Sequence, residues 1–179
     1  MKNSDDKTNV MRLLDKAKID YIPHGFAVEE GDSLDVRTAA QKLGKAPEEV
    51  FKTLVTKGAK GGYFVFVVPG TGNLDLKKAA KSVGEKSIEM LKLSELFPLT
   101  GYVHGGCSPV GMKKAFPTVI DESVLALKTV TVSAGKIGRQ IELAPADLIK
   151  FTRAKTADIV TAEYSHAKIN QSRAQKLGF

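Results

Sequence analysis

The sequence predicts a single α+β domain built on a mixed, largely antiparallel sheet that helices flank. The chain has 179 residues and 42% apolar composition, which suits one domain with a full hydrophobic core. Strand-like and helix-like segments are intermixed, and no linker, repeat or low-complexity run divides them. The strands are joined by hairpins more often than by regular strand–helix–strand units, which favours α+β over a parallel sheet.

Local signals justify the elements of the first part of the chain. Residues 8–18 carry apolar side chains at three- and four-residue spacing, which predicts a helix. Residues 20–26 form a strand that Pro23 confines to a sheet edge, because proline cannot donate to the ladder. Asp35 is a suitable N-cap for a helix over 35–43, and the glycine that follows ends it.

The middle of the chain predicts a hairpin and a capped helix. Strands at 50–56 and 63–68 flank a glycine turn, and the second is apolar enough to be central. Asn73 or Asp75 caps the next helix, whose inward face is expected to include Leu76. The remaining elements expected are strands at 87–90, 102–103, 118–121, 128–132 and 139–143, and short helices at 94–97 and 146–151.

The two ends of the chain differ from its centre. We expect residues 1–7 to be a flexible polar leader, 8–160 to be the domain and 161–179 to be a basic tail. The net charge of +7 suits a polyanionic partner such as nucleic acid. No apolar run is long enough to span a bilayer, and a single cysteine excludes a disulfide within the chain. A cytoplasmic protein with no membrane contact is expected.

Two glycine-rich loops are candidate binding elements. Residues 101–111 contain four glycines and Pro109, and residues 133–139 contain two glycines and two cations. Glycine has no Cβ, so a ligand can lie directly on the backbone. The simpler alternative is that each loop is an ordinary sheet turn. A shared site requires the two loops to face each other.

Lys52 is the strongest single candidate for a functional side chain. It lies between apolar residues of a predicted strand, where a buried ammonium needs an anion, a carbonyl or a ligand. An edge position would instead let its stem reach water. Ser133, at the start of the second loop, is either a hydroxyl donor to a ligand or a turn residue.

The lone Cys107 lies in the first glycine loop, three residues after His104, as a nucleophile with a nearby base would. A small apolar filler after a glycine turn is the favoured interpretation. The three histidines of the chain have no metal-ligand spacing, so neither a metal nor a cofactor is expected.

Five ordered blocks of the sequence resemble one known family. They are Phe51-Lys52-Thr53-Leu54 and the segments 74–81, 101–102 with 105–111, 133–136 and 141–148. The chain resembles the YbaK/EbsC proteins, which are freestanding relatives of the editing domain inserted in bacterial prolyl-tRNA synthetase. The resemblance runs from about residue 8 to residue 160. It implies a barrel-like version of the predicted fold.

The resemblance also implies site residues and reveals departures from the family pattern. Phe26 stands where a tyrosine is common, Cys107 where an aliphatic residue is usual, and Gln140 where some members carry an aspartate. Ala134 replaces the middle glycine of a Ser-Gly-Gly loop. The residues implied to be catalytic are Lys52, Gly105, Ser133 and Gly135, and those implied to bind substrate are Phe26, Gly106, Ser108 and Ala134.

The activity implied is trans-editing, the removal of cysteine from mischarged Cys-tRNA(Pro) by a deacylase. The partners implied are the 3′ aminoacyl-adenosine end of tRNA and prolyl-tRNA synthetase. Pocket size separates cysteine from alanine only weakly, so the thiol of the substrate is expected to cleave its own ester. Two alternatives stay open: an Ala-tRNA(Pro) deacylase that uses water, and a non-catalytic module that binds tRNA ends or a synthetase.

Overall fold

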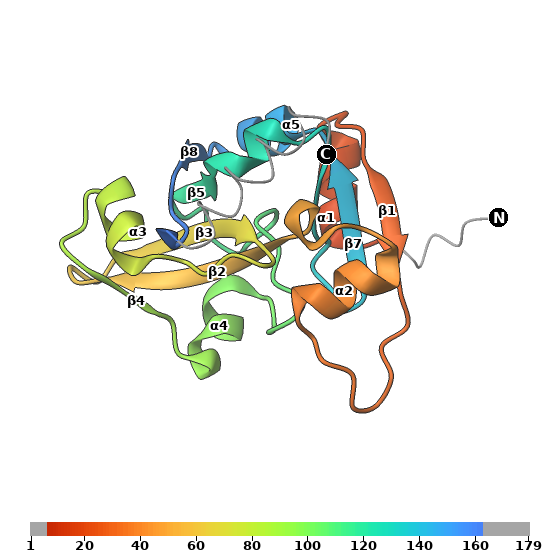
Figure 1. Ribbon diagram of the computed structural model, residues 1–179, viewed down its shortest axis with the longest axis horizontal. Helices are drawn as coiled ribbons and strands as arrows, with labels where there is room; N and C mark the ends of the chain where they lie inside the picture. Colours follow the sequence, from red (N-terminus) through yellow and green to blue (C-terminus); the bar gives the residue numbers. More distant parts are fainter. Residues whose placement is uncertain (1–6, 163–179) are drawn as a thin grey trace.

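Strands of two sheets form the framework of the part of the chain that the computed structural model describes, residues 7–162 (Figure 1). The smaller sheet is antiparallel with the order β1-β7-β6, and the larger has the order β4-β2-β3-β5-β8. Strand β5 pairs in parallel with both β3 and β8, whereas the other pairs are antiparallel. The mixed, largely antiparallel α+β architecture is therefore confirmed.

The bounds of the elements follow the sequence patterns closely. The strands are β1 Ile22–Gly25, β2 Phe51–Gly58, β3 Tyr63–Pro69, β4 Ile88–Met90, β5 Thr118–Asp121, β6 Val130–Ser133, β7 Arg139–Leu143 and β8 Lys155–Ala157. The helices are α1 Asn9–Lys16, α2 Val36–Leu43, α3 Leu76–Ser82, α4 Leu93–Thr100 and α5 Pro145–Thr152, with short 3-10 helices at η2 Pro47–Glu49 and η3 Glu122–Ala126.

The helix caps are those that the sequence predicts. The Asp35 carboxylate accepts the Thr38 N–H at 2.8 Å and begins α2, which ends at Gly44 with a φ of 65°. Asp75, rather than Asn73, caps α3. Strand β1, which contains Pro23, is an edge strand, as expected.

Strand β3 is buried on both faces, which explains why its sequence is apolar throughout. Val65 and Val67 belong to a cluster that the two sheets enclose together with α1 and α5. Phe66 and Val68 point the other way, into a second cluster under α3. The central position predicted for this strand is confirmed.

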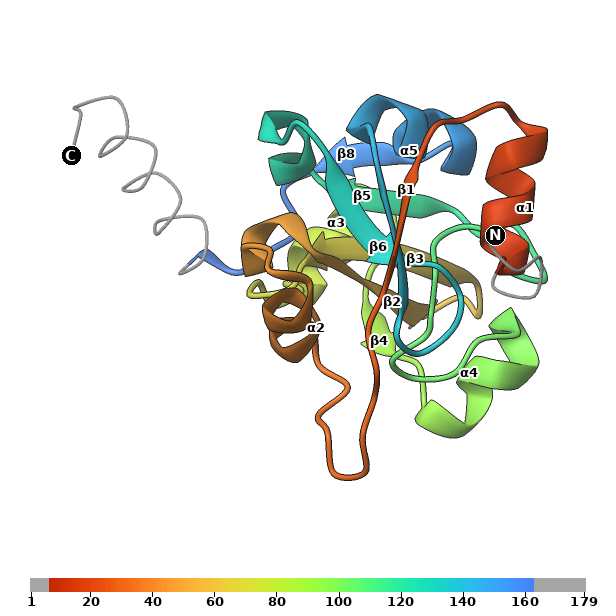
Figure 2. The ribbon, with the colours of Figure 1, turned by 90° about the vertical axis from the view of Figure 1, so that its right-hand side faces the viewer.

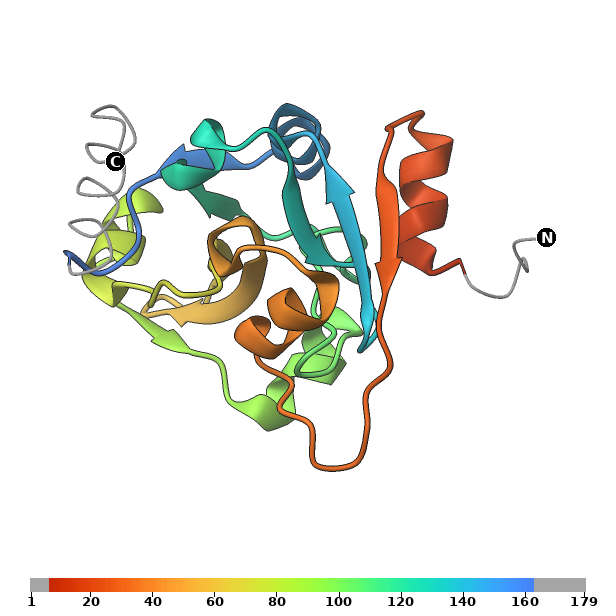
Figure 3. The same ribbon diagram turned by 45° about the vertical axis from the view of Figure 1, so that its right-hand side comes forward.

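The two sheets meet at one point near the start of β2. Val50 forms an isolated parallel bridge with Thr131, and no other bridge between the sheets is present within residues 7–162. The barrel-like closure is therefore partial. Helix α2 lies beside η2, just before the start of β2, and a long loop leads into it from β1 (Figures 2 and 3).

Three expectations about local structure are wrong, and one strand was not predicted. Leu76 is 40% exposed instead of facing inward, because it borders a cavity. Tyr102 is not in a strand; the burial of its ring and the hydrogen bond that its hydroxyl donates to the Val110 carbonyl at 2.5 Å hold this segment. Helix α4 is longer than expected and runs through Pro98. Strand β8 was missed because its three residues show no apolar alternation.

The predicted basic tail, residues 161–179, lies outside the described residues except for its first two positions. The predicted leader, residues 1–7, lies outside them except for Lys7. Within the described part, none of the helices has the length and apolarity needed to cross a bilayer.

Glu142 ties together several segments of the smaller sheet. One carboxylate oxygen accepts from Lys45 Nζ at 2.6 Å and from Thr129 Oγ1 at 2.9 Å, and the other lies 3.0 Å from His24 Nε2. The hydrogen bond from Lys45 is the main cause that lowers the pKa of Glu142 from 4.5 to about 2. The carboxylate is only 12% exposed, so solvent screens the interaction weakly.

Glu142→Gln should lower the free energy of unfolding at pH 7 by about 1–3 kcal/mol. Because the folded pKa lies below the unfolded value, this stabilisation is present above pH 4.5 and is lost as the pH falls toward 2. Denaturant unfolding at a series of pH values should therefore show a shallower acid loss in the variant. Glu89→Gln, on the exposed face of β4, is the matched control. Equal pH slopes for the wild type and Glu142→Gln would contradict this assignment.

Candidate functional site

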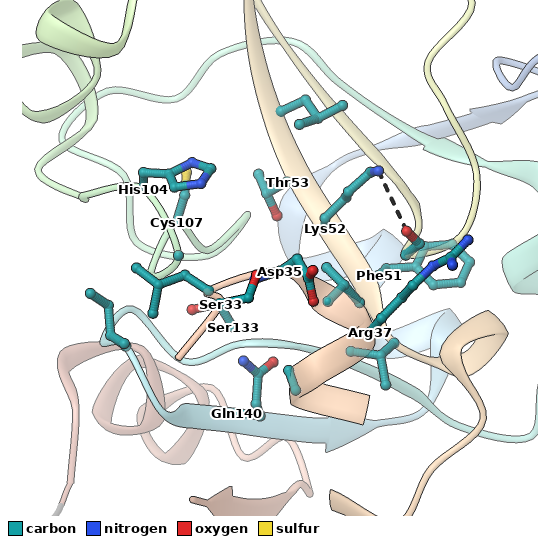
Figure 4. Close-up of a pocket in the computed structure, with 18 of the residues that line it drawn as sticks. Ser33, Asp35, Arg37, Phe51, Lys52, Thr53, His104, Cys107, Ser133 and Gln140 are labelled. Carbon is teal, nitrogen blue, oxygen red and sulfur yellow. Dashed lines mark hydrogen bonds between the residues drawn. The ribbon is translucent and has the colours of Figure 1, made fainter. Parts of the chain in front are cut away.

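A cavity of about 610 Å³ opens between the first turn of α2, the start of β2 and the two glycine loops (Figure 4). Its volume lies in the range of pockets that hold small ligands. Most of its exposed lining is apolar, with a few polar groups, as is usual for such pockets. Four of the residues implied to form the site lie in its wall: Phe26, Lys52, Gly105 and Ser133.

The structure brings the two glycine loops together. A Cβ on Gly106 would lie 3.1 Å from the backbone nitrogen of Ile137, so the first loop packs directly on the second. Gly105 has a φ of 85°, and a Cβ there would lie 3.1 Å from the Leu34 side chain. The two glycine loops and the segment around Leu34, which are distant in the sequence, thus meet at one end of the cavity through close contacts with the backbone of Gly105 and Gly106.

Lys52 offers a half-buried cation to the cavity. The hydrogen bond that its ammonium donates to the Gly70 carbonyl is long, at 3.5 Å (Figure 4). No carboxylate within residues 7–162 forms an ion pair with it. Burial is the main cause that lowers the pKa of Lys52, and the positive charge of Arg37 lowers it further. An anion or a strongly polar ligand would relieve both effects.

An open strand edge forms a second part of the wall. Strand β4 pairs with β2 only from Thr56 to Gly58, and the Leu91 N–H bonds the Val55 carbonyl at 3.1 Å. Backbone groups alternate along an antiparallel strand, so those of Thr53 face the same side as those of Val55. Among residues 7–162, no strand pairs with that side at Thr53, which borders the cavity. Its backbone can therefore hydrogen-bond to a ligand.

The Thr53 side chain adds a polar atom to the same wall. Its hydroxyl oxygen is buried and has no hydrogen-bond partner within the described residues. Unsatisfied buried polar atoms are rare in folded proteins, and a binding site is one of the places where they occur. The sequence indicated Thr53 only as part of a strand and a family block.

Ser133 and Gln140 stand opposite each other on paired strands and line the cavity (Figure 4). The Ser133 hydroxyl oxygen accepts the Gly135 N–H at 3.1 Å, and no acceptor for its hydrogen is found in the described part of the chain. Gln140 is 6% exposed, and its amide forms no side-chain hydrogen bond within residues 7–162. Both side chains can therefore orient a ligand, which gives Gln140 a place in the site.

The other four residues implied to form the site lie behind the cavity wall. Ser108 is fully buried, and its hydroxyl oxygen accepts the Val110 N–H at 3.2 Å. Ala134 is also fully buried. The amides of Gly106 and Gly135 are already donated within their own loops, to Val103 and Ser133. These residues shape the loops, and their contribution to binding or catalysis stays a prediction.

The amides that remain for a ligand belong to other residues of the first loop. Gly105 and Cys107 both line the cavity, and no hydrogen bond within the described residues occupies their backbone N–H groups. The Gly135 N–H, by contrast, is donated to the Ser133 hydroxyl. The catalytic roles implied for Gly105 and Gly135 stay predictions.

Two charged lining residues were missed as site candidates. Asp35 and Arg37 stand at the start of α2, and the sequence indicated only the capping role of Asp35. A helix pattern carries no information about which other segment its first turn approaches, so the residues themselves gave no signal. The described residues contain no group of three or more His, Cys, Asp or Glu that could hold a metal ion.

Cys107 lines the cavity, but its thiol is not activated. Burial raises its pKa to about 12. His104 also lines the cavity, yet no hydrogen bond joins the two side chains in the described structure. This environment favours the interpretation of Cys107 as an apolar filler.

The fold and this cavity define an aminoacyl-tRNA editing domain. The family model described as "Aminoacyl-tRNA editing domain" matches residues 30–151, and the chain belongs to this family.

Individual relatives are consistent with that family. The chain is 47% identical over 162 residues to "Putative Cys-tRNA(Pro)/Cys-tRNA(Cys) deacylase EbsC" of Enterococcus faecalis, a match that covers 90% of this chain and 98% of that protein. It is 29% identical over 101 residues to "Proline--tRNA ligase" of Thermosipho melanesiensis, covering 56% of this chain and 18% of the ligase. A solved structure described as "a putative trans-editing enzyme for prolyl tRNA synthetase" superposes with a TM-score of 0.74 at 28% identity, covering 86% of this chain and 95% of that one.

Alkylation of Cys107 in the folded protein should be slow. At pH 8 a thiol with a raised pKa contains little thiolate, so we expect iodoacetamide to react roughly 100-fold or more slowly than with an ordinary cysteine. Mass spectrometry can follow the reaction because this is the only cysteine of the chain. The same protein in concentrated urea is the control and should react at the ordinary rate. Equally fast alkylation of the folded protein would restore Cys107 as a candidate nucleophile.

Proposed function

We propose that this protein is a trans-editing deacylase that removes cysteine from mischarged Cys-tRNA(Pro). The observation that carries the proposal is the half-buried Lys52 ammonium, which faces a cavity without an ion-pair partner among the described residues. Membership of the editing family supports the reaction class. The 47% identical relative, named for action on Cys-tRNA(Pro) and Cys-tRNA(Cys), supports the amino acid.

The polar groups of the cavity suit the parts of an aminoacyl-adenosine. Ser133 and Gln140 lie at the end where the glycine loops meet and can orient the aminoacyl group. The open edge of β2 at Thr53 can accept from and donate to the same group. Lys52 then lies beside the ester and the ribose, where a cation stabilises the negative charge that develops in the reaction.

The proposed chemistry uses the thiol of the substrate as the nucleophile. The sulfur attacks the carbonyl carbon of its own ester, a C–S bond forms, and the C–O bond to the ribose breaks. The thiol proton ends on the ribose hydroxyl that leaves with the tRNA. The product is a strained cyclic thioester, which water opens to free cysteine. No side chain of the protein becomes acylated, in agreement with the unactivated Cys107.

The protein contributes orientation and charge stabilisation to this reaction. The unoccupied amides of Gly105 and Cys107 can donate to the oxyanion that forms on the ester carbonyl. One such donor typically contributes about 2.7–4 kcal/mol to transition-state stabilisation. The nearby cation Lys52 favours the thiolate of the substrate over its thiol, because opposite charges favour the ionised form.

We further propose that the protein acts in the cytoplasm beside prolyl-tRNA synthetase. The support is the resemblance of part of this chain to part of a proline–tRNA ligase. The positive net charge suits the approach of tRNA. A synthetase held nearby would supply mischarged tRNA before other proteins bind it.

Lys52→Ala should abolish deacylation of Cys-tRNA(Pro), with a loss of at least about 100-fold in rate, because the cavity loses the cation that faces the ester. The assay is the release of radiolabelled cysteine from purified Cys-tRNA(Pro). Lys57→Ala on the same strand but outside the cavity is the matched control and should retain activity. Circular dichroism should confirm that both variants fold. A fully active Lys52→Ala protein would refute the proposed site.

The identity of the acyl group should decide the nucleophile. If the thiol of the substrate attacks, Cys-tRNA(Pro) is cleaved, whereas Ala-tRNA(Pro) and S-methylcysteinyl-tRNA(Pro) persist at the uncatalysed rate. Cys107→Ala should stay near the wild-type rate because the thiol of the protein takes no part. Cleavage of the alanyl ester would instead indicate a deacylase that uses water. Binding of tRNA without release of any amino acid would indicate a non-catalytic module.

A further inference from the structure

Two cations share one end of the cavity, and neither has an anionic partner in the described structure. The hydrogen bond found for the Lys52 ammonium among the described residues is the long one to the Gly70 carbonyl. Arg37 lines the cavity, and no hydrogen bond or ion pair of its guanidinium occurs within residues 7–162. The charge of Arg37 is close enough to lower the pKa of Lys52. Two like charges that face one space favour an anion between them.

A close backbone contact places Arg37 at this position. A Cβ on Gly70 would lie 2.2 Å from Val36 Cγ1 and 2.9 Å from the Val50 carbonyl oxygen, so only glycine fits. The first turn of α2 therefore packs directly on the segment that follows β3. Arg37, one residue further along, extends beside the carbonyl that Lys52 contacts (Figure 4). The spacing of the two cations depends on packing rather than on a flexible loop.

The nearby carboxylate does not neutralise this pair. Asp35 also lines the cavity, but its side chain accepts the Thr38 N–H at 2.8 Å as the cap of α2. That hydrogen bond is the main cause that lowers the pKa of Asp35, ahead of the charge of Arg37. No ion pair joins Asp35 to Arg37 within the described residues. The planar guanidinium fork thus stays available for bidentate binding of an oxyanion.

The order of groups along the cavity matches the order of groups at the end of a tRNA. Figure 4 shows Ser133 and Gln140 toward one side, Arg37 toward the other and Lys52 between them. An aminoacylated terminal adenosine presents the aminoacyl ester, then the ribose, then the phosphate on its 5′ side. With the ester at the Ser133 side, the ribose falls near Lys52 and this phosphate falls at Arg37.

We propose that Arg37 binds the 5′ phosphate of the terminal adenosine, while Lys52 lies beside the ribose and the ester, and that Arg37 makes the site specific for a nucleotide over a nucleoside. This inference rests on the proposed function for the orientation of the substrate. It assigns to Arg37 a binding role that contributes to affinity and leaves the chemical step unchanged. The recognised group is a phosphate monoester or diester attached to a nucleoside.

Binding of small probes tests the phosphate site without any turnover. In isothermal titration calorimetry, wild-type protein should bind adenosine 5′-monophosphate about tenfold or more tightly than adenosine, as expected for a charge-assisted bidentate contact. Arg37→Gln should lose this preference and keep the affinity for adenosine. Arg12→Gln, on the exposed face of α1, is the matched control and should keep the preference. Inorganic phosphate alone should bind more weakly than the nucleotide; equal binding would indicate a free-phosphate site and overturn the assignment to the substrate.

Kinetics on Cys-tRNA(Pro) tests the role of Arg37 in the reaction. Arg37→Gln should raise KM about tenfold with an unchanged kcat, the pattern of a lost uniform binding contact. The dependence of KM on salt should also weaken, with a slope smaller by about 0.7 for one lost single-strand phosphate contact. A variant that is merely less stable would not change this slope.

The outcomes separate the two proposals. An unchanged KM and salt slope in Arg37→Gln, or no preference of the wild type for the nucleotide, would overturn the phosphate site and leave the deacylase proposal intact. A wild-type protein that prefers the nucleotide through Arg37 but releases no amino acid would support the phosphate site and refute the deacylase.

Discussion

The structure depends on a strand edge that the sheet leaves unpaired. Strand β2 follows a bridge to β6 at Val50 and is covered by β4 only from Thr56 onward, so Thr53 between them presents its backbone donor and acceptor to the cavity. Exposed sheet edges of this kind attract other strands, and proteins usually cover or interrupt them. Here α2 and the two glycine loops surround the edge without pairing with it. The result is a cavity whose wall contains unpaired backbone groups beside a side-chain cation.

Glycine at a few positions allows the covering segments to come this close. Gly70 brings α2 onto the end of β3, and Gly106 brings the first loop onto the second. At each of these positions a Cβ would displace backbone or a short branched side chain. The polar groups of the site are therefore held by packed backbone, which is the arrangement that preorganised binding requires.

The fold was predictable because most of its signals are local. Alternation, caps and a doubly buried apolar strand indicated β2, β3, α2 and α3, and Asp35 was recognised as a cap. Strand β8 was not predictable, because parallel pairing with β5 depends on a partner far away in the sequence. The residues of the site likewise divide into those that local sequence indicates and those that depend on contacts between distant segments. Lys52 was indicated by its own surroundings, whereas Arg37 and the Thr53 edge depend on which segments meet. The hydrogen bond from the Gly135 N–H to the Ser133 hydroxyl likewise depends on the folded loop and was not apparent from the sequence.

The large and mostly apolar cavity has a consequence for sequence variation. Under the proposed mechanism the distinguishing reactivity belongs to the substrate, so the wall need not match one side chain closely. Leu34, Cys107 and Ile137 can then be exchanged for residues of similar bulk while the backbone groups and the cation persist. Across the whole match, a backbone with a TM-score of 0.74 is likewise kept with 28% identical residues. Gly70 and Gly106, whose close contacts bring the covering segments together, are expected to be less exchangeable than the apolar side chains of the wall.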